Sequence, residues 1–217
     1  MRKRRRVAAC LVILSWLGFG LFAATLAAEK DPAPLLDILL RLKADLPALE
    51  QLQTTGRKMT AECAPCHGEN GLSAKELISN LAGQNPDYLL RQMEALVSGT
   101  RKHISMSPSL DKLFPEERAT VALYYASLSV PAQSADAPAV ARGARLYQKR
   151  CLACHGRDAY GTATVPRLAG QRRDYMRWTL AAVQRGKPRP IPEMEASCRG
   201  LSRQDIADLA DYLATLP

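Results

Sequence analysis

Two short segments of the sequence carry two cysteines and a histidine at an identical spacing. Both follow the pattern Cys-x-x-Cys-His, 88 positions apart, and their residues are Cys63, Cys66, His67, Cys151, Cys154 and His155. Two thiols at this spacing can add to the two vinyl groups of one haem, and the histidine then lies under the iron as a ligand. The alternative is a structural or redox cysteine pair that a histidine follows by chance. Two copies of the pattern at equivalent positions argue against this alternative. The pattern predicts two covalently bound haem c groups, with His67 and His155 as iron ligands.

Methionine is the candidate for the sixth position on each iron. Of the six methionines, only Met106 and Met194 occupy equivalent positions, each 39 residues after its motif histidine. Met93 and Met176 stand opposite leucines in the other copy, which is typical of helix core. A thioether sulfur favours ferrous iron, and a six-coordinate iron has no open position for a substrate. We therefore expect His/Met ligation at both irons, suited to outer-sphere electron transfer.

Two other residues compete for these axial positions. His103 lies three residues before Met106 and is the only histidine outside the motifs, but its counterpart in the second copy is Ile191. Cys198 lies four residues after Met194, where a thiolate would lower the potential. A small buried residue is the simpler interpretation of Cys198. The sequence leaves both alternatives open.

Pro166 is a candidate to support the second histidine, which precedes it by 11 residues. Its carbonyl can accept the Nδ1 proton of His155, a bond that orients the ring and tunes the iron. A plain loop proline is the alternative. The first copy has Ser79 at this position, which predicts that His67 is held differently.

The motifs belong to a longer unit that the sequence contains twice. Leu-Ala-Gly-Gln occurs at 81–84 and again at 168–171, an offset of 87, and the methionines return to an offset of 88. This compensated gap fits two copies of one domain with a variable loop. We therefore predict domains at 55–130 and 140–217. Prolines and small residues predict a linker at 131–139.

Both copies show the same order of helical segments. The expected ranges are 56–62, 86–97 and 115–128 in the first copy, and 140–150, 173–184 and 202–216 in the second. Gly99 and Gly186 fit helix ends, and Ser202 with Asp205 predicts a capping box. An irregular stretch is expected to carry each methionine. No segment shows the alternation typical of strands, so the fold class is all-α.

Residues 29–54 have no counterpart in the repeat. Their leucines fall near helical spacing, with an interruption at Pro47, so a helical segment is expected. This segment would act either as a spacer or as a cover over exposed core. The sequence leaves both roles open.

Residues 1–28 have the order of an export signal. A basic cluster at 2–6 precedes 22 uncharged residues at 7–28. That length also suffices for a membrane-spanning helix, and no clean cleavage pattern follows it. A cleaved signal peptide and a retained anchor are both open, and either one exports the rest of the chain.

Charge is unevenly distributed along the chain, whose net charge is +9. Residues 29–130 carry 11 basic and 13 acidic side chains, and residues 131–217 carry 14 and 8. The resulting −2 and +6 predict that the two halves dock different partners, with Arg172 and Arg173 on the basic surface; ordinary surface charge is the alternative. Spread-out basic residues without a recognition motif argue against nucleic acid as a partner.

Each half resembles a class I cytochrome c. The pair, with Leu-Ala-Gly-Gln-x-x-x-Tyr after each haem motif, resembles the cytochrome c4 family over residues 55–217. The resemblance implies two His/Met domains related by a pseudo-twofold axis, with the haem edges close across the interface. By motif match, Cys63, Cys66, His67 and Met106 bind one haem, and Cys151, Cys154, His155 and Met194 bind the other. The serine before the first Leu-Ala-Gly-Gln, the segment 29–54 and the leader depart from the family pattern.

The resemblance also implies a function. The protein would carry electrons in the periplasm from a quinol-oxidising bc1-type complex to a terminal oxidase, and it would not be an enzyme. A retained leader would tether it to the inner membrane. The alternatives are a haem subunit of a dehydrogenase, such as flavocytochrome c sulfide dehydrogenase, and a dihaem thiosulfate-oxidising enzyme or peroxidase. An enzyme would need an open or labile iron.

Overall fold

A computed structural model describes residues 33–187 and 191–217, and the regular structure in these ranges is helical throughout. The predicted all-α fold class is confirmed. Residues 1–28, with the predicted signal peptide or anchor, lie outside the described residues. Within the described ranges, no helix combines the length and the apolarity needed to cross a bilayer.

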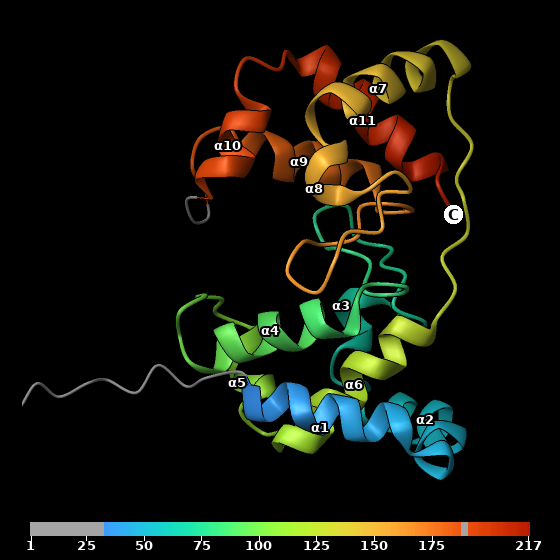
Figure 1. Cartoon of the computed structure of the whole chain (residues 1–217), viewed down its shortest axis with the longest axis vertical. Coiled ribbons are helices and arrows are strands. Elements are labelled where there is room, and N and C mark those ends of the chain that lie inside the picture. The colour runs from blue at the N-terminus through green and yellow to red at the C-terminus, as the bar shows by residue number, and fades with distance from the viewer. Residues whose placement is uncertain (1–32, 188–190) are drawn as a thin grey trace, which may run out of the picture. The chain divides into compact units, whose positions relative to one another are not determined.

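The helices of the first half pack around one apolar core (Figure 1). Their ranges are α1 Ala33–Ala44, α2 Leu46–Met59, α3 Ala64–His67, α4 Pro86–Val97, α5 Met106–Leu110 and α6 Pro115–Ser127. Helix α6 contacts α1, α2 and α4 and is the central element of this core. Its Tyr124 and Tyr125 are almost fully buried, with ring centroids 5.5 Å apart.

The helices of the second half repeat the order of α2 to α6 around a core of their own. Their ranges are α7 Ala137–Arg150, α8 Leu152–His155, α9 Arg173–Val183, α10 Pro192–Cys198 and α11 Arg203–Thr215. Helix α11 packs against α7 and α9 (Figure 1). The rings of Tyr147 and Tyr212 lie 5.5 Å apart at the crossing of α7 and α11. The repeat in the sequence is therefore a repeat in structure.

Helix bounds agree with the sequence where caps mark them. Helix α4 has the predicted bounds, and α6 and α9 end one residue early. The predicted capping box of α11 is confirmed, since the Ser202 hydroxyl accepts from the Asp205 N–H at 3.1 Å and the Asp205 carboxylate accepts from the Ser202 N–H at 2.8 Å. Gly99 and Gly186 follow α4 and α9 with φ of 76° and 66°, as helix-ending glycines do.

The stretches that carry the two methionines are short helices, so the expectation of irregular structure is wrong. Met106 is the first residue of α5, and Met194 is the third residue of α10. Helices of five and seven residues are too short to leave a periodic signal in the sequence. They are held instead by neighbours, α5 by α4 and α10 by α9.

The segment before the repeat packs onto the first core. Leu39 of α1 is fully buried, and Leu52 of α2 belongs to the same cluster. This packing matches a cover over the core rather than a spacer. Helix α2 runs across position 55, so it joins the segment expected to be helical at 29–54 to the helix expected from residue 56. Pro47 lies in its first turn, where no backbone hydrogen bond is lost.

The connection between the halves is shorter than predicted, because α7 begins at Ala137. Asp136 caps this helix by accepting from the Ala139 N–H at 3.1 Å, and Pro138 occupies the first turn. Within the connection, the Gln133 N–H donates to the Ala214 carbonyl at 2.9 Å. The connection therefore lies against the end of α11.

Candidate haem sites

The attachment cysteines lie on one helical turn in each half. Cys63 and Cys151 immediately precede α3 and α8, and the second cysteine and the histidine of each motif lie within those helices. Side chains three positions apart on a helical turn lie on the same side. One cysteine of each pair is half-buried, the other is exposed, and none of the four is in a disulfide. A haem edge can therefore reach both thiols of a pair from one side.

Burial keeps the first thiol of each pair protonated. It raises the pKa of Cys63, and it raises the pKa of Cys151 to about 12. Before a haem is attached, both groups are therefore S–H at neutral pH. This form supplies both the sulfur and the hydrogen that add across a vinyl double bond to make a thioether.

A backbone carbonyl orients each motif histidine. Nδ1 of His67 lies 2.9 Å from the Ser79 oxygen, and Nδ1 of His155 lies 3.0 Å from the Pro166 oxygen. A carbonyl can only accept, so Nδ1 carries the proton and Nε2 keeps the lone pair that binds iron. Burial also lowers the pKa of both imidazoles, which favours the neutral form that a metal requires. The residues fit a haem iron in both halves.

The expectation that His67 is held differently from His155 is wrong. Ser79 replaces the proline, yet its carbonyl occupies the same place at a nearly equal distance. The hydrogen bond uses a backbone oxygen, which every residue possesses. The side chain at this position therefore does not decide how the histidine is held.

Met106 and Met194 have equivalent surroundings in the two halves, and their role as axial ligands stays a prediction. Both are half-buried at the edge of the core of their own half, against which the first cysteine of each motif also packs. Met93 and Met176 belong to the interior of those cores, with 8% and 2% of their surface exposed. The interpretation of the second pair as helix core is confirmed.

The two rival ligands differ in their surroundings. His103 is exposed at the end of the loop that leads into α5. Cys198 is buried in the second core, and its carbonyl accepts from the Gln184 side chain at 3.0 Å. Its position agrees with the small buried residue that the sequence indicated.

Two glycines that the sequence analysis missed position the helices leading into the motifs. A Cβ on Gly56 would lie 2.5 Å from Cβ of Tyr124, and a Cβ on Gly143 would lie 2.0 Å from the backbone oxygen of Asp208. Both distances are too short for any other residue, so α2 crosses α6, and α7 crosses α11, in near-backbone contact. The sequence did contain a signal for these close crossings, because Gly56 lies seven residues before the first motif and Gly143 eight residues before the second.

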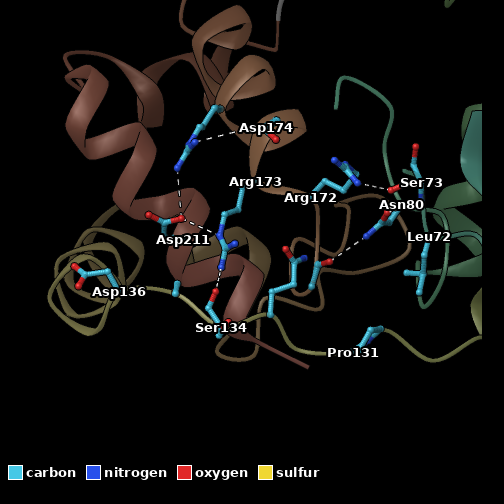
Figure 2. A pocket seen from close by; sticks show the side chains of 14 residues that line it. Leu72, Ser73, Asn80, Pro131, Ser134, Asp136, Arg172, Arg173, Asp174 and Asp211 are labelled. Carbon is cyan, nitrogen blue, oxygen red and sulfur yellow. Dashed lines mark hydrogen bonds and ion pairs between the residues drawn. The ribbon is translucent and has the colours of Figure 1, made fainter. Parts of the chain in front are cut away.

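Arg172 and Arg173, predicted for a docking surface, make contacts within the molecule instead (Figure 2). Arg172 donates to the Ser73 carbonyl in the first half. Nε of Arg173 lies 2.9 Å from the Asp211 carboxylate, and the same guanidinium donates to the Ser134 carbonyl. These groups border a hollow of about 690 Å³ beside the connection between the halves. Charge reversal at Arg172 and Arg173 would break these internal contacts. A slower electron transfer in such a variant would therefore not be a specific test of docking.

Paired thiols, an oriented imidazole and a nearby methionine, built twice on one helical unit, define a c-type cytochrome with two haem sites. A sequence profile of the cytochrome c family matches residues 140–217. Cytochrome c4 of Pseudomonas aeruginosa is 31% identical over 174 residues, which cover 74% of this chain and 87% of that protein. The crystal structure of reduced cytochrome c4 from Pseudomonas stutzeri superposes with a TM-score of 0.67 at 28% identity and covers 76% of this chain and 98% of the other.

The chain belongs to the cytochrome c4 family, and its cofactor is two covalently bound haem c groups. It is thus a haem protein of electron transport. A further structure, thiosulfate dehydrogenase (TsdBA) from Marichromatium purpuratum, is similar to 76% of this chain, with a TM-score of 0.60 and 32% identity. The match spans 40% of that longer chain.

Proposed function

We propose that this protein carries electrons in the periplasm from a quinol-oxidising bc1-type complex to a terminal oxidase. The observation that carries the proposal is the equal treatment of the two histidines. Both donate Nδ1–H to a backbone carbonyl at 2.9 to 3.0 Å. Two irons held alike suit an electron relay, whereas an enzyme needs one iron to differ and to stay open.

In this proposal the chain supplies all the protein ligands of both haems. Cys63 and Cys66 anchor the first haem, with His67 and Met106 on its iron. The equivalent residues of the second site are Cys151, Cys154, His155 and Met194, with Pro166 as the support of the histidine. When bound, each haem supplies a one-electron iron couple. The protein's part is to hold the iron six-coordinate and to keep it close to the surface.

We also propose the domain division that the ligand sets require. One c-type domain would end near residue 130 and include the covering helices α1 and α2, and the other would span 140–217. The leader at 1–28 would direct export and, if retained, would tether the carrier to the inner membrane near its partners. Mass spectrometry of the native N-terminus decides between cleavage and tethering.

A second candidate function is thiosulfate oxidation, which the likeness to thiosulfate dehydrogenase favours. That reaction needs an iron with a labile ligand. Because the likeness covers less than half of the enzyme, we expect this chain to correspond to a part that relays electrons rather than to the whole catalyst.

Haem counting and carbon monoxide binding test the proposal together. A pyridine haemochrome assay of denatured protein should give two haems per chain, and a Cys63→Ala/Cys66→Ala variant, which lacks both thiols of the first motif, should give one. The reduced native protein should not bind carbon monoxide, because both irons are six-coordinate. Two covalent haems retained in the variant, carbon monoxide binding to the native protein, or turnover with thiosulfate would each contradict the carrier assignment.

A further inference from the structure

The two halves hold each other through a reciprocal pair of glutamines. The Gln171 side chain accepts from the Asn80 N–H at 2.7 Å and donates to the Asn80 carbonyl at 3.0 Å. The Gln84 side chain makes the same pair of bonds to Arg167, at 2.8 and 3.0 Å. Both glutamines have 7% of their surface exposed. Each therefore clamps the backbone of the other half in a largely dry environment.

The clamped peptide groups are the ones that orient the histidines. The Asn80 N–H and the Ser79 carbonyl belong to one peptide group, so this group accepts from His67 at 2.9 Å and donates to Gln171 at 2.7 Å. The Pro166–Arg167 peptide likewise accepts from His155 and donates to Gln84. In each half, a continuous chain of hydrogen bonds runs from the histidine, through one peptide, to the glutamine of the other half.

We propose that Gln171 tunes the first haem and Gln84 tunes the second, so that each half sets the potential of the haem bound to the other. The inference rests on the proposed ligation of iron by His67 and His155. Hydrogen bonds in a chain polarise one another, so an acceptor on the peptide N–H makes the peptide oxygen a stronger acceptor. That oxygen then forms a stronger hydrogen bond with the histidine Nδ1–H, which raises the basicity of the imidazole that binds iron.

The direction of the effect follows from charge. Reduction adds one electron to the iron, and the Nδ1 proton stays on the histidine. A more basic imidazole stabilises ferric iron and lowers the potential. Losing the glutamine acceptor should therefore raise the potential of the haem in the opposite half. Both glutamines are positioning residues, because each acts on iron through a peptide and a histidine.

The neighbouring contacts supply an internal control. The Asn85 side chain donates to the Tyr160 carbonyl at 2.7 Å, which also joins the two halves. This bond reaches neither of the peptides that accept from a histidine. The Asn85 backbone N–H also donates to the Gln84 side chain at 3.0 Å, and alanine keeps this bond. Asn85→Ala therefore removes a contact between the halves and retains every bond of the two chains.

The experiment compares three variants of the full haem-loaded protein, Gln171→Leu, Gln84→Leu and Asn85→Ala. Redox titration gives both potentials, and ¹H–¹⁵N resonances of the two histidine rings assign each potential and report the Nδ1–H bond. Gln171→Leu should raise the potential of the first haem, by up to about a tenfold change in the ferric-to-ferrous equilibrium, or about 59 mV. Gln84→Leu should raise the potential of the second haem by a similar amount. Asn85→Ala should not shift the potential of one haem relative to that of the other.

A further variant guards against a loss of folding. Gln171→Glu in its protonated form can keep both bonds to Asn80, because the carboxyl C=O accepts from the N–H and the O–H donates to the carbonyl. It should therefore shift the potential of the first haem less than Gln171→Leu does. Equal shifts of both haems, a fall in potential in the leucine variants, or no shift would overturn the inference. Failure of the proposed ligation is distinguishable, because it would appear in the unmodified protein as a His67 or His155 ring without iron-bound resonances.

Discussion

At the scale of single residues, the proposed ligand Met106 would fill the sixth coordination position of the first iron. Met106→Ala should open that iron to carbon monoxide and lower its potential by about 60 mV or more, because the thioether favours ferrous iron. The second haem should be unaffected. Absorption spectra with carbon monoxide and a redox titration measure both effects.

The control for this prediction is Met93→Leu, a change of similar volume in the interior of the same core. It should leave the spectrum and the carbon monoxide response of the first haem as they are. An unchanged first haem in Met106→Ala would reject the ligand assignment, and His103 would then be the next candidate.

Chemistry that rests on side chains could be predicted from the sequence, and chemistry that rests on the backbone could not. The attachment motifs and the paired methionines are visible because only cysteine, histidine and methionine supply those ligand atoms. The sequence predicts that His67 is held differently from His155, because Ser79 stands where the second copy has Pro166. The structure shows the same bond in both halves. The acceptor is a carbonyl, and its place depends on how the loop folds.

At the scale of helices, the crossing of α7 and α11 depends on the missing side chain of Gly143. Gly143→Ala would place a Cβ 2.0 Å from the Asp208 carbonyl oxygen and force the two helices apart. We expect a loss of about 1–3 kcal/mol in the free energy of unfolding, although alanine is the better helix former. Denaturant unfolding of the haem-loaded protein measures this loss.

Arg145→Ala is the matched substitution on the exposed side of the same helix. It introduces alanine without a clash and should change stability little. Equal stability of Gly143→Ala and the parent protein would show that the crossing tolerates a larger separation, contrary to this account.

Helices α4 and α6 are joined by a nearly buried ion pair. Nε of Arg118 lies 2.5 Å from the Glu94 carboxylate, and the two side chains have 9% and 15% of their surface exposed. Glu94→Ala would leave the guanidinium buried without its counter-ion, so we expect a loss of about 3 kcal/mol in the free energy of unfolding. Thermal or denaturant unfolding tests this.

Two further variants separate the loss of the pair from the loss of one charge. Glu94→Leu/Arg118→Leu removes both charges and should recover most of the stability, since apolar replacements of buried pairs are often well tolerated. Glu62→Ala breaks the exposed pair with Lys112 and should have little effect. A double variant as unstable as Glu94→Ala would argue that packing, not charge, holds this contact.

Long helices could be predicted from sequence, whereas the elements around them were set by contacts. Helix α4 carries its own signals, with Pro86 in the first turn and Gly99 shortly beyond its end. Helix α2 joins the end of the segment expected to be helical at 29–54 to the helix expected from residue 56, and its packing beside α6 makes one continuous helix of the two. The short α5 has no sequence period to detect.

At the scale of the whole molecule, the sequence showed which residues repeat but not what they contact. Leu-Ala-Gly-Gln was visible twice, and nothing in it indicates that each glutamine bonds to the other half. Contacts between residues 91 and 83 positions apart depend on how the two copies associate. For the same reason the sequence did not show that Arg172 donates to the Ser73 carbonyl of the other copy.

The remaining prediction at this scale concerns the charge difference of −2 and +6 between the halves. Arg157 is exposed and follows His155, the last residue of the second attachment motif, by two positions. Arg157→Glu should slow electron transfer with an acidic partner by about tenfold at low salt, because exposed charges act mainly on the rate of encounter. Lys58→Glu makes the same charge change on an exposed position of α2 in the first half and should have a smaller effect.

Salt near 0.1 M shortens the reach of these charges to about 10 Å, so stopped-flow rates of the two variants should converge as salt is added. Rates that ignore ionic strength, or equal slowing by both substitutions, would show that the basic half does not steer docking.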